Sequence, residues 1–216
     1  MSATITETFH KYMTDKIRLS KWQKVGVLML VWVFAGFFGW VYEFIFYFFN
    51  GGMEKFYMQG GNFLPWINIY AIGAILILVM IFSLHLKRRP LLVFLLSMII
   101  TGVLEFVVGW LVYNIGGGTR FWDYNTEILN FGNIDGFVCL RSVLVFGVSA
   151  LMLMYLVVPV FIWMAQKMSK RAFLVLAILL FSIVMLDEVY NILASKILLD
   201  LMDATEVYRA LGLEYV

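Results

Sequence analysis

Five long apolar stretches constrain the fold of this chain more than any other feature. They cover residues 25–49, 65–84, 91–115, 137–164 and 172–199. A helix needs about 20 predominantly apolar residues to cross the hydrocarbon core of a bilayer, and each stretch is long enough. Glycine pairs, a proline and clustered charges separate the stretches, which is typical of loops. The sequence therefore predicts an all-α, polytopic transmembrane helical bundle with five spans.

The composition supports this class. Of the 216 residues, 63% are hydrophobic and 14% are charged, whereas about a quarter of residues are charged in an ordinary soluble domain. We expect a cytoplasmic or interfacial N-terminal segment over residues 1–24, a membrane domain over residues 25–199 and an acidic extracytoplasmic tail over residues 200–216. The first segment does not match a cleaved signal, because the apolar stretch after it is too long for a signal-peptide core.

Lysine and arginine report the orientation of the spans. They gather before the first apolar stretch, between the second and third, and between the fourth and fifth. Short cytoplasmic segments retain positive charge, so we expect these three segments inside. The other two connections hold only Lys55 and Arg120 as basic residues. The pattern predicts a multi-pass protein of the cell membrane with its N-terminus in the cytoplasm and its C-terminus outside.

Several ionisable residues fall inside the apolar stretches. They are Glu43, Glu105, Arg141, Asp187, Glu188 and Lys196. Such residues are costly in a bilayer and normally face the bundle interior or a wet cavity. With the predicted orientation, all of them fall in the middle or outer half of the membrane. We therefore hypothesise a common polar chamber, open or openable to the outside, with Arg141 at its centre. Its expected carboxylate partners are Glu43, Glu105, and Asp187 or Glu188.

Simpler interpretations stay open for these polar residues. A buried arginine–carboxylate pair also holds helices in register without any substrate. In the outer connection, Trp122, Asp123 and Asp135 are candidates for covering the chamber. However, aromatic residues gather at membrane interfaces whatever the function, and acidic outer loops are ordinary under the positive-inside bias.

The chain lacks the motifs of several enzyme classes. It has no Gly-x-x-x-x-Gly-Lys-Ser/Thr phosphate loop, so the chain itself is not a P-loop ATPase. The single Cys139, with His10 and His85 on the predicted cytoplasmic side, gives no zinc-ligand pattern. We expect no metal and no cofactor, and we assign no catalytic residue. The net charge of +2 is spread along the chain, which argues against nucleic acid as a partner.

Four stretches of sequence carry a resemblance to a known family. They are residues 38–43 (FGWVYE), 65–74 (PWINIYAIGA), 101–109 (TGVLEFVVG), and Trp122-Asp123-Tyr124 followed by Asn133-Ile134-Asp135-Gly136. In this respect the chain resembles the bacterial membrane proteins described as putative ABC-transporter type IV, or CmpB-like, permeases. The resemblance implies a permease of the bacterial cell membrane that works with a separate ATPase or another membrane subunit, and it is compatible with a homo-oligomer. The two predicted cytoplasmic loops have about six residues each, so we expect transport without ATP coupling.

Two functions from different classes follow. The first is a transporter or transporter subunit whose outward-facing chamber binds a polar or charged solute. Its expected lining is Glu43, Tyr70, Glu105, Arg141, and Asp187 or Glu188. The alternative is an enzyme at the outer leaflet that acts on a lipid headgroup or lipid-linked substrate, with a carboxylate as general base and Arg141 binding phosphate. A third interpretation is an accessory protein without a substrate, in which the charges serve helix assembly alone.

Overall fold

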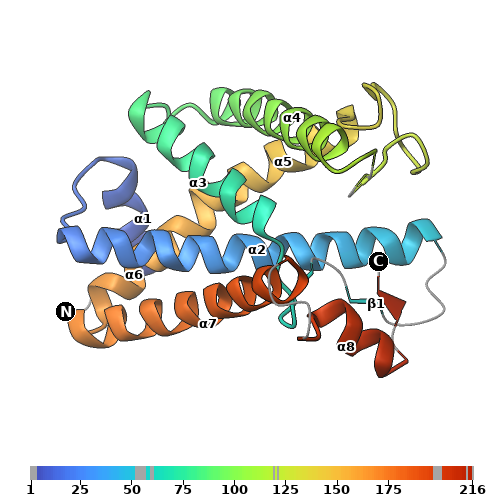
Figure 1. Ribbon diagram of the computed structural model, residues 1–216. Helices are drawn as coiled ribbons and strands as arrows, with labels where there is room; N and C mark the ends of the chain where they lie inside the picture. Colours follow the sequence, from blue (N-terminus) through green and yellow to red (C-terminus); the bar gives the residue numbers. More distant parts are fainter. Residues whose placement is uncertain are drawn as a thin grey trace. The chain divides into compact units, whose positions relative to one another are not determined.

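The protein is predominantly helical in the parts that its computed structural model describes (Figure 1). These are residues 4–51, 57–58, 61–118, 120, 122–196, 201–212 and 214–215. The helices are α1 (Ile5–Met13), α2 (Lys21–Gly51), α3 (Asn68–Ser83), α4 (Pro90–Ile115), α5 (Leu140–Met152), α6 (Val158–Lys167), α7 (Lys170–Lys196) and α8 (Ala204–Ala210). A π-helical segment, η1 (Leu153–Val157), joins α5 to α6. Two-residue strands, β1 (Tyr57–Met58) and β2 (Glu214–Tyr215), pair in parallel. The predicted helical class is confirmed.

Four helical segments are long and apolar enough to cross a membrane. They are Lys21–Phe49, Pro90–Ile115, Leu140–Lys167 and Lys170–Ala194, and each coincides with a predicted span. The remaining predicted span, residues 65–84, contains α3, which has only 16 residues. At about 1.5 Å per residue α3 covers roughly 24 Å, less than the hydrocarbon thickness of about 30 Å. The predicted end of the last span, at residue 199, lies outside the described residues.

The π-helical segment lies one residue before a proline. Pro159 follows Val158 in α6, and proline has no N–H to donate to the preceding turn. In a π-helical turn the backbone hydrogen bonds join residues five apart instead of four apart, which widens the helix at this point. The two α-helices therefore continue as one 28-residue span, Leu140–Lys167, rather than as two separate elements.

The chain folds into two compact units. The first consists of Met1–Thr8, Ile17–Ile72 and Val160–Val216, and the second of Phe9–Lys16 and Gly73–Pro159. In the first unit α2 and α7 run side by side (Figure 1). Trp66, just before α3, packs directly on the backbone of α2 at Gly36, where a Cβ atom would lie 2.0 Å from the indole nitrogen. The backbone N–H of Ile67 also donates to the carbonyl of Gly36, at 3.1 Å.

In the second unit α4 packs against α5 (Figure 1). The buried positions of α4 recur every fourth residue and therefore share one face of the helix. They are Val93, Ser97, Thr101, Glu105 and Gly109. Small residues on such a face allow two membrane helices to approach closely. Gly147 of α5 serves the same purpose, because a Cβ atom there would lie 2.7 Å from the Phe94 ring.

The N-terminal segment is fixed to the connection between α3 and α4 within the second unit. Lys87 donates to the carbonyl of Tyr12 at 2.6 Å and forms an ion pair with Asp15. Arg88 donates to the carbonyl of Met13 at 2.7 Å and pairs with Asp15 at 2.8 Å. The hydrogen bond from Lys87, with the positive charges of both basic residues, holds the pKa of Asp15 below its usual value.

Candidate functional site

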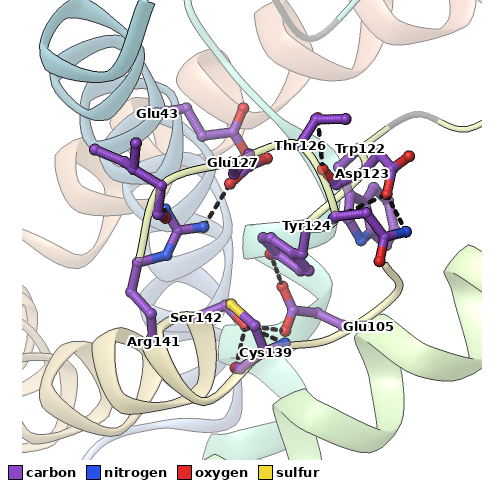
Figure 2. A network of polar contacts seen from close by, with 12 residues as sticks. Glu43, Glu105, Trp122, Asp123, Tyr124, Thr126, Glu127, Cys139, Arg141 and Ser142 are labelled. Carbon is purple, nitrogen blue, oxygen red and sulfur yellow. Dashed lines mark hydrogen bonds and ion pairs between the residues drawn. The ribbon is translucent and has the colours of Figure 1, made fainter. Parts of the chain in front are cut away.

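A buried carboxylate lies in the second half of α4. Glu105 is 5% exposed. Its Oε1 atom accepts a hydrogen bond from the Tyr124 hydroxyl at 2.6 Å, and its Oε2 atom accepts one from the Ser142 hydroxyl at 2.7 Å (Figure 2). Both donors are neutral. Within the part of the chain that the structure describes, Glu105 has no ion pair.

The connection between α4 and α5 places Tyr124 over this carboxylate. The backbone N–H of Tyr124 donates to the carbonyl of Gly136 at 3.1 Å, and Gly136 has a φ of +76°, a conformation that glycine adopts without strain. Tyr124 is 8% exposed. Burial, followed by the nearby charge of Glu105, raises the pKa of Tyr124 above its usual value. The phenol therefore keeps its proton and acts as a donor.

Ser142 reaches the same carboxylate from the first turn of α5. Its hydroxyl is fixed by the backbone N–H of Cys139, which donates to Ser142 Oγ at 3.4 Å. Cys139 is buried and in the reduced form, as expected for a small packing residue. Neither Ser142 nor Tyr124 carries a sequence signal as a ligand of Glu105, because they lie 37 and 19 residues away along the chain.

The buried arginine of α5 pairs with a residue that the sequence reasoning did not select. Arg141 Nη2 lies 2.5 Å from Glu127 Oε2, with side chains only 10% and 8% exposed (Figure 2). Arg141 Nη1 also donates to the carbonyl of Ile128 at 3.3 Å, and the guanidinium lies 5.4 Å from the centre of the Tyr124 ring. Within the second unit, the ion pair of Arg141 is therefore with Glu127 and not with the expected Glu105.

The loop residues predicted to cover the chamber form contacts that stabilise the loop. The Trp122 indole donates to the carbonyl of Phe137 at 2.9 Å. Asp123 Oδ1 accepts from the backbone N–H of Asn125 at 3.0 Å and lies 3.7 Å from Arg120 Nη1. Asp135 contributes its backbone carbonyl, which accepts from Arg120 at 2.7 Å. These contacts shape the connection that carries Tyr124 and Glu127.

In the first unit, Glu43 lies beside Tyr70. The Tyr70 hydroxyl donates to Glu43 Oε1 at 2.9 Å. The Tyr70 ring packs on α2 at Gly39, where a Cβ atom would lie 2.1 Å from the ring. Both residues are predicted to line the chamber, and the structure brings these two together.

The two acidic residues of α7 hold the non-helical segment before α3. Asp187 Oδ1 accepts from the backbone N–H of Phe63 at 3.1 Å, and its Oδ2 accepts from that of Leu64 at 2.7 Å. Glu188 accepts from the side-chain amides of Asn62 at 2.9 Å and Asn68 at 2.7 Å. Irregular backbone at membrane depth requires such partners inside the protein. Asp187 and Glu188 thus supply acceptors that an apolar helix would lack.

The predicted site residues therefore gather in separate groups within the two units. Glu105 and Arg141 share the Tyr124 environment in the second unit, whereas Glu43, Tyr70, Asp187 and Glu188 belong to the first. A single chamber that unites all of them stays a prediction. The side chain of Lys196 lies outside the described residues.

Comparison with known proteins identifies the family. A model of the family described as "Putative ABC-transporter type IV" matches residues 30–192, which include Glu43, Glu105, Arg141 and the acidic pair of α7. No curated protein and no solved structure matches the chain. The family match spans most of the sequence, from α2 into α7, and agrees with the resemblance drawn from the four sequence stretches. The chain belongs to the putative ABC-transporter type IV family of membrane proteins.

Proposed function

We propose that the protein is a transporter, or the membrane subunit of one, that binds a polar or charged solute at Glu105. Its family and its four long apolar helices indicate a multi-pass membrane protein of the transporter type. The finer claim concerns the site. Glu105 is the carboxylate that we assign to solute binding, with Tyr124 and Ser142 positioning it.

The observation that carries this proposal is that Glu105 is buried and, among the described residues, forms no ion pair. A buried carboxylate is stable when it is paired with a cation or saturated with hydrogen bonds. Glu105 receives two bonds from neutral hydroxyls, although a carboxylate has about four acceptor positions. The nearby Arg141 is bonded to Glu127. A solute that brings N–H or O–H donors, or a positive charge, would complete the coordination of Glu105.

The positive-inside pattern supports access to this site from the outside. In the predicted orientation α4 runs outward, so the connection that holds Tyr124 and Glu127 is extracytoplasmic. Glu105 is the sixteenth residue of the 26-residue α4 (Pro90–Ile115). It then lies beyond the middle of the membrane, toward the outer surface.

Short connections on the opposite side support transport without ATP coupling. Met168 and Ser169 alone join α6 to α7, and six residues join Ser83 of α3 to Pro90 of α4. An ATPase that drives a permease needs a substantial cytoplasmic surface to push against. Here that surface is limited to these connections and the N-terminal segment.

Solute-evoked currents test the proposal. The full chain is reconstituted in liposomes on a solid-supported membrane and exposed in turn to amino acids, amines, organic acids and inorganic phosphate. We expect at least one class to evoke a current that protein-free liposomes lack. Glu105→Gln should abolish this current, because the amide removes the charge and presents donors to Tyr124 and Ser142, which are themselves donors.

A matched control distinguishes the loss of the Glu105 carboxylate from the loss of any one carboxylate. Glu7 lies on the exposed side of α1, so Glu7→Gln removes one carboxylate far from α4 in sequence and should leave the current unchanged. Circular dichroism and size exclusion establish that both variants are folded. An undiminished current in folded Glu105→Gln would contradict the proposal.

A further inference from the structure

The buried face of α4 carries two hydroxyl groups between Glu105 and the start of the helix. Thr101 and Ser97 precede Glu105 by four and eight residues and are 1% and 0% exposed. At about 1.5 Å per residue, each position lies roughly 6 Å from the next along the helix axis. Thr101 and Ser97 therefore form a polar line that extends about 12 Å from Glu105 toward the start of α4.

Ser97 is the feature of this line that packing does not explain. In the described part of the chain, its Oγ atom is buried and has no hydrogen-bond partner. Thr101, by contrast, donates to the carbonyl of Ser97 at 2.8 Å, the usual way for a helix to satisfy a hydroxyl in an apolar setting. Ser97 lies between Phe94 and Met98, the residues that contact α5 at Gly147. Its hydroxyl is thus directed into the helix interface, and a buried unpaired hydroxyl is costly.

Two side chains already bind the Glu105 carboxylate from the α4–α5 connection and from α5. Tyr124 and Ser142 bond to its two oxygens, and burial raises the pKa of Tyr124, so this phenol does not pass a proton by ionising. The charged groups nearest to Glu105 in the second unit are Arg141 and Glu127, which are paired with each other. Glu105 is not part of this ion pair.

We propose that Glu105 binds a proton that reaches it along Ser97 and Thr101, and that this proton is coupled to the movement of the solute. The proposal rests on the proposed transport function and adds the coupling ion to it. A hydronium ion at the Ser97 end transfers H⁺ through intervening water to Glu105 Oε. An O–H bond forms on the carboxylate, and a neutral water molecule is left behind. The route requires water between successive hydroxyls to bridge gaps of roughly 6 Å.

Infrared difference spectroscopy on the full chain in lipid nanodiscs tests this directly, with the proton itself as the probe. A pH change should reveal the carbonyl band of a protonated carboxylic acid that is missing in Glu105→Gln. After a switch from H₂O to D₂O, this band shifts at the rate at which the Glu105 proton exchanges. Ser97→Ala and Thr101→Val should slow the shift about tenfold, because each removes one hydroxyl from the line. Thr101→Ser retains the hydroxyl and should exchange at the wild-type rate.

Each outcome decides the proposal. A spectrum in which Glu105→Gln removes no acid band overturns proton binding, and equal exchange rates in wild type, Ser97→Ala and Thr101→Val overturn the route. The two claims also fail separately. Solute currents without a Glu105 acid band would leave the transport proposal standing and refute the coupling. A Glu105 acid band with the predicted exchange rates, but no solute current, would leave proton binding at Glu105 standing and refute transport together with its coupling.

Discussion

Removing the carboxylate of Asp187 should release the non-helical segment that precedes α3. In Asp187→Ala, three hydrogen bonds are lost: those from the backbone N–H groups of Phe63 and Leu64, and the one that the Asn191 amide donates to the carboxylate. Hydrogen bonds inside membrane proteins contribute about 0.6 kcal/mol each on average, and a buried donor left unpaired costs about 1–3 kcal/mol. Phe63 and Leu64 are only half-buried, so we use the contribution of about 0.6 kcal/mol for each hydrogen bond lost. The expected loss in the free energy of unfolding is ~2 kcal/mol, or roughly 30-fold in the equilibrium constant.

Reversible unfolding in mixed micelles, titrated with dodecyl sulfate, measures this loss. Asp187→Asn retains one acceptor oxygen and should lose about half as much. Leu186→Ala is the control, because Leu186 is 69% exposed on the same helix and makes no comparable bond. Hydrogen exchange of the Phe63 and Leu64 amides should accelerate in Asp187→Ala alone. An Asp187→Ala protein as stable as Leu186→Ala, with unchanged exchange at these amides, would refute the reasoning.

Two further predictions concern packing and pH. Gly36→Ala should destabilise the protein by about 1–3 kcal/mol, because its Cβ atom would lie 2.0 Å from the Trp66 indole nitrogen, whereas Gly73→Ala meets its nearest neighbour at 3.7 Å and should be close to neutral in the same unfolding titration. The hydrogen bond from Lys87 is the largest cause of the lowered pKa of Asp15. The ionised Asp15 carboxylate therefore stabilises the docked N-terminal segment at pH values above the usual pKa of aspartate. This stabilisation is lost as the pH falls through the lowered pKa. The protection of the Ile5–Met13 amides, taken relative to the intrinsic exchange rate at each pH, should therefore fall on acidification in the wild-type protein and be low at all pH values in Asp15→Asn; wild-type protection that is insensitive to acid would contradict this assignment.

Hydropathy was sufficient to predict most of the fold. The predicted spans at residues 25–49, 91–115, 137–164 and 172–199 each fall on a long apolar helix, because a bilayer selects uninterrupted helices of about this length. The span predicted at residues 65–84 stays a prediction: it contains the shorter apolar helix Asn68–Ser83, and Pro65–Ile67 before it are not helical. The backbone N–H groups of Phe63 and Leu64 donate to Asp187, which lies more than 120 residues away, and an average over neighbouring residues cannot detect such a partner.

The candidate site was predictable in part. Glu105 and Arg141 stood out because charge is rare in an apolar stretch, and both are buried. Their partners were not predictable, because Tyr124 and Glu127 lie in an irregular connection whose backbone course depends on loop contacts such as that of Tyr124 with Gly136. Ser97 was also missed. A lone serine in an apolar helix gains meaning only when its hydroxyl is found buried and without a partner.

The claim that solute binds at Glu105 is tested most directly by an electron cryo-microscopy structure of the protein with the solute that evokes the current. The account predicts solute density in contact with the Glu105 carboxylate, with at least one of the hydrogen bonds from Tyr124 and Ser142 exchanged for a bond from the solute. Density bound elsewhere, with both hydroxyls still on Glu105 at 2.6 and 2.7 Å, would contradict it.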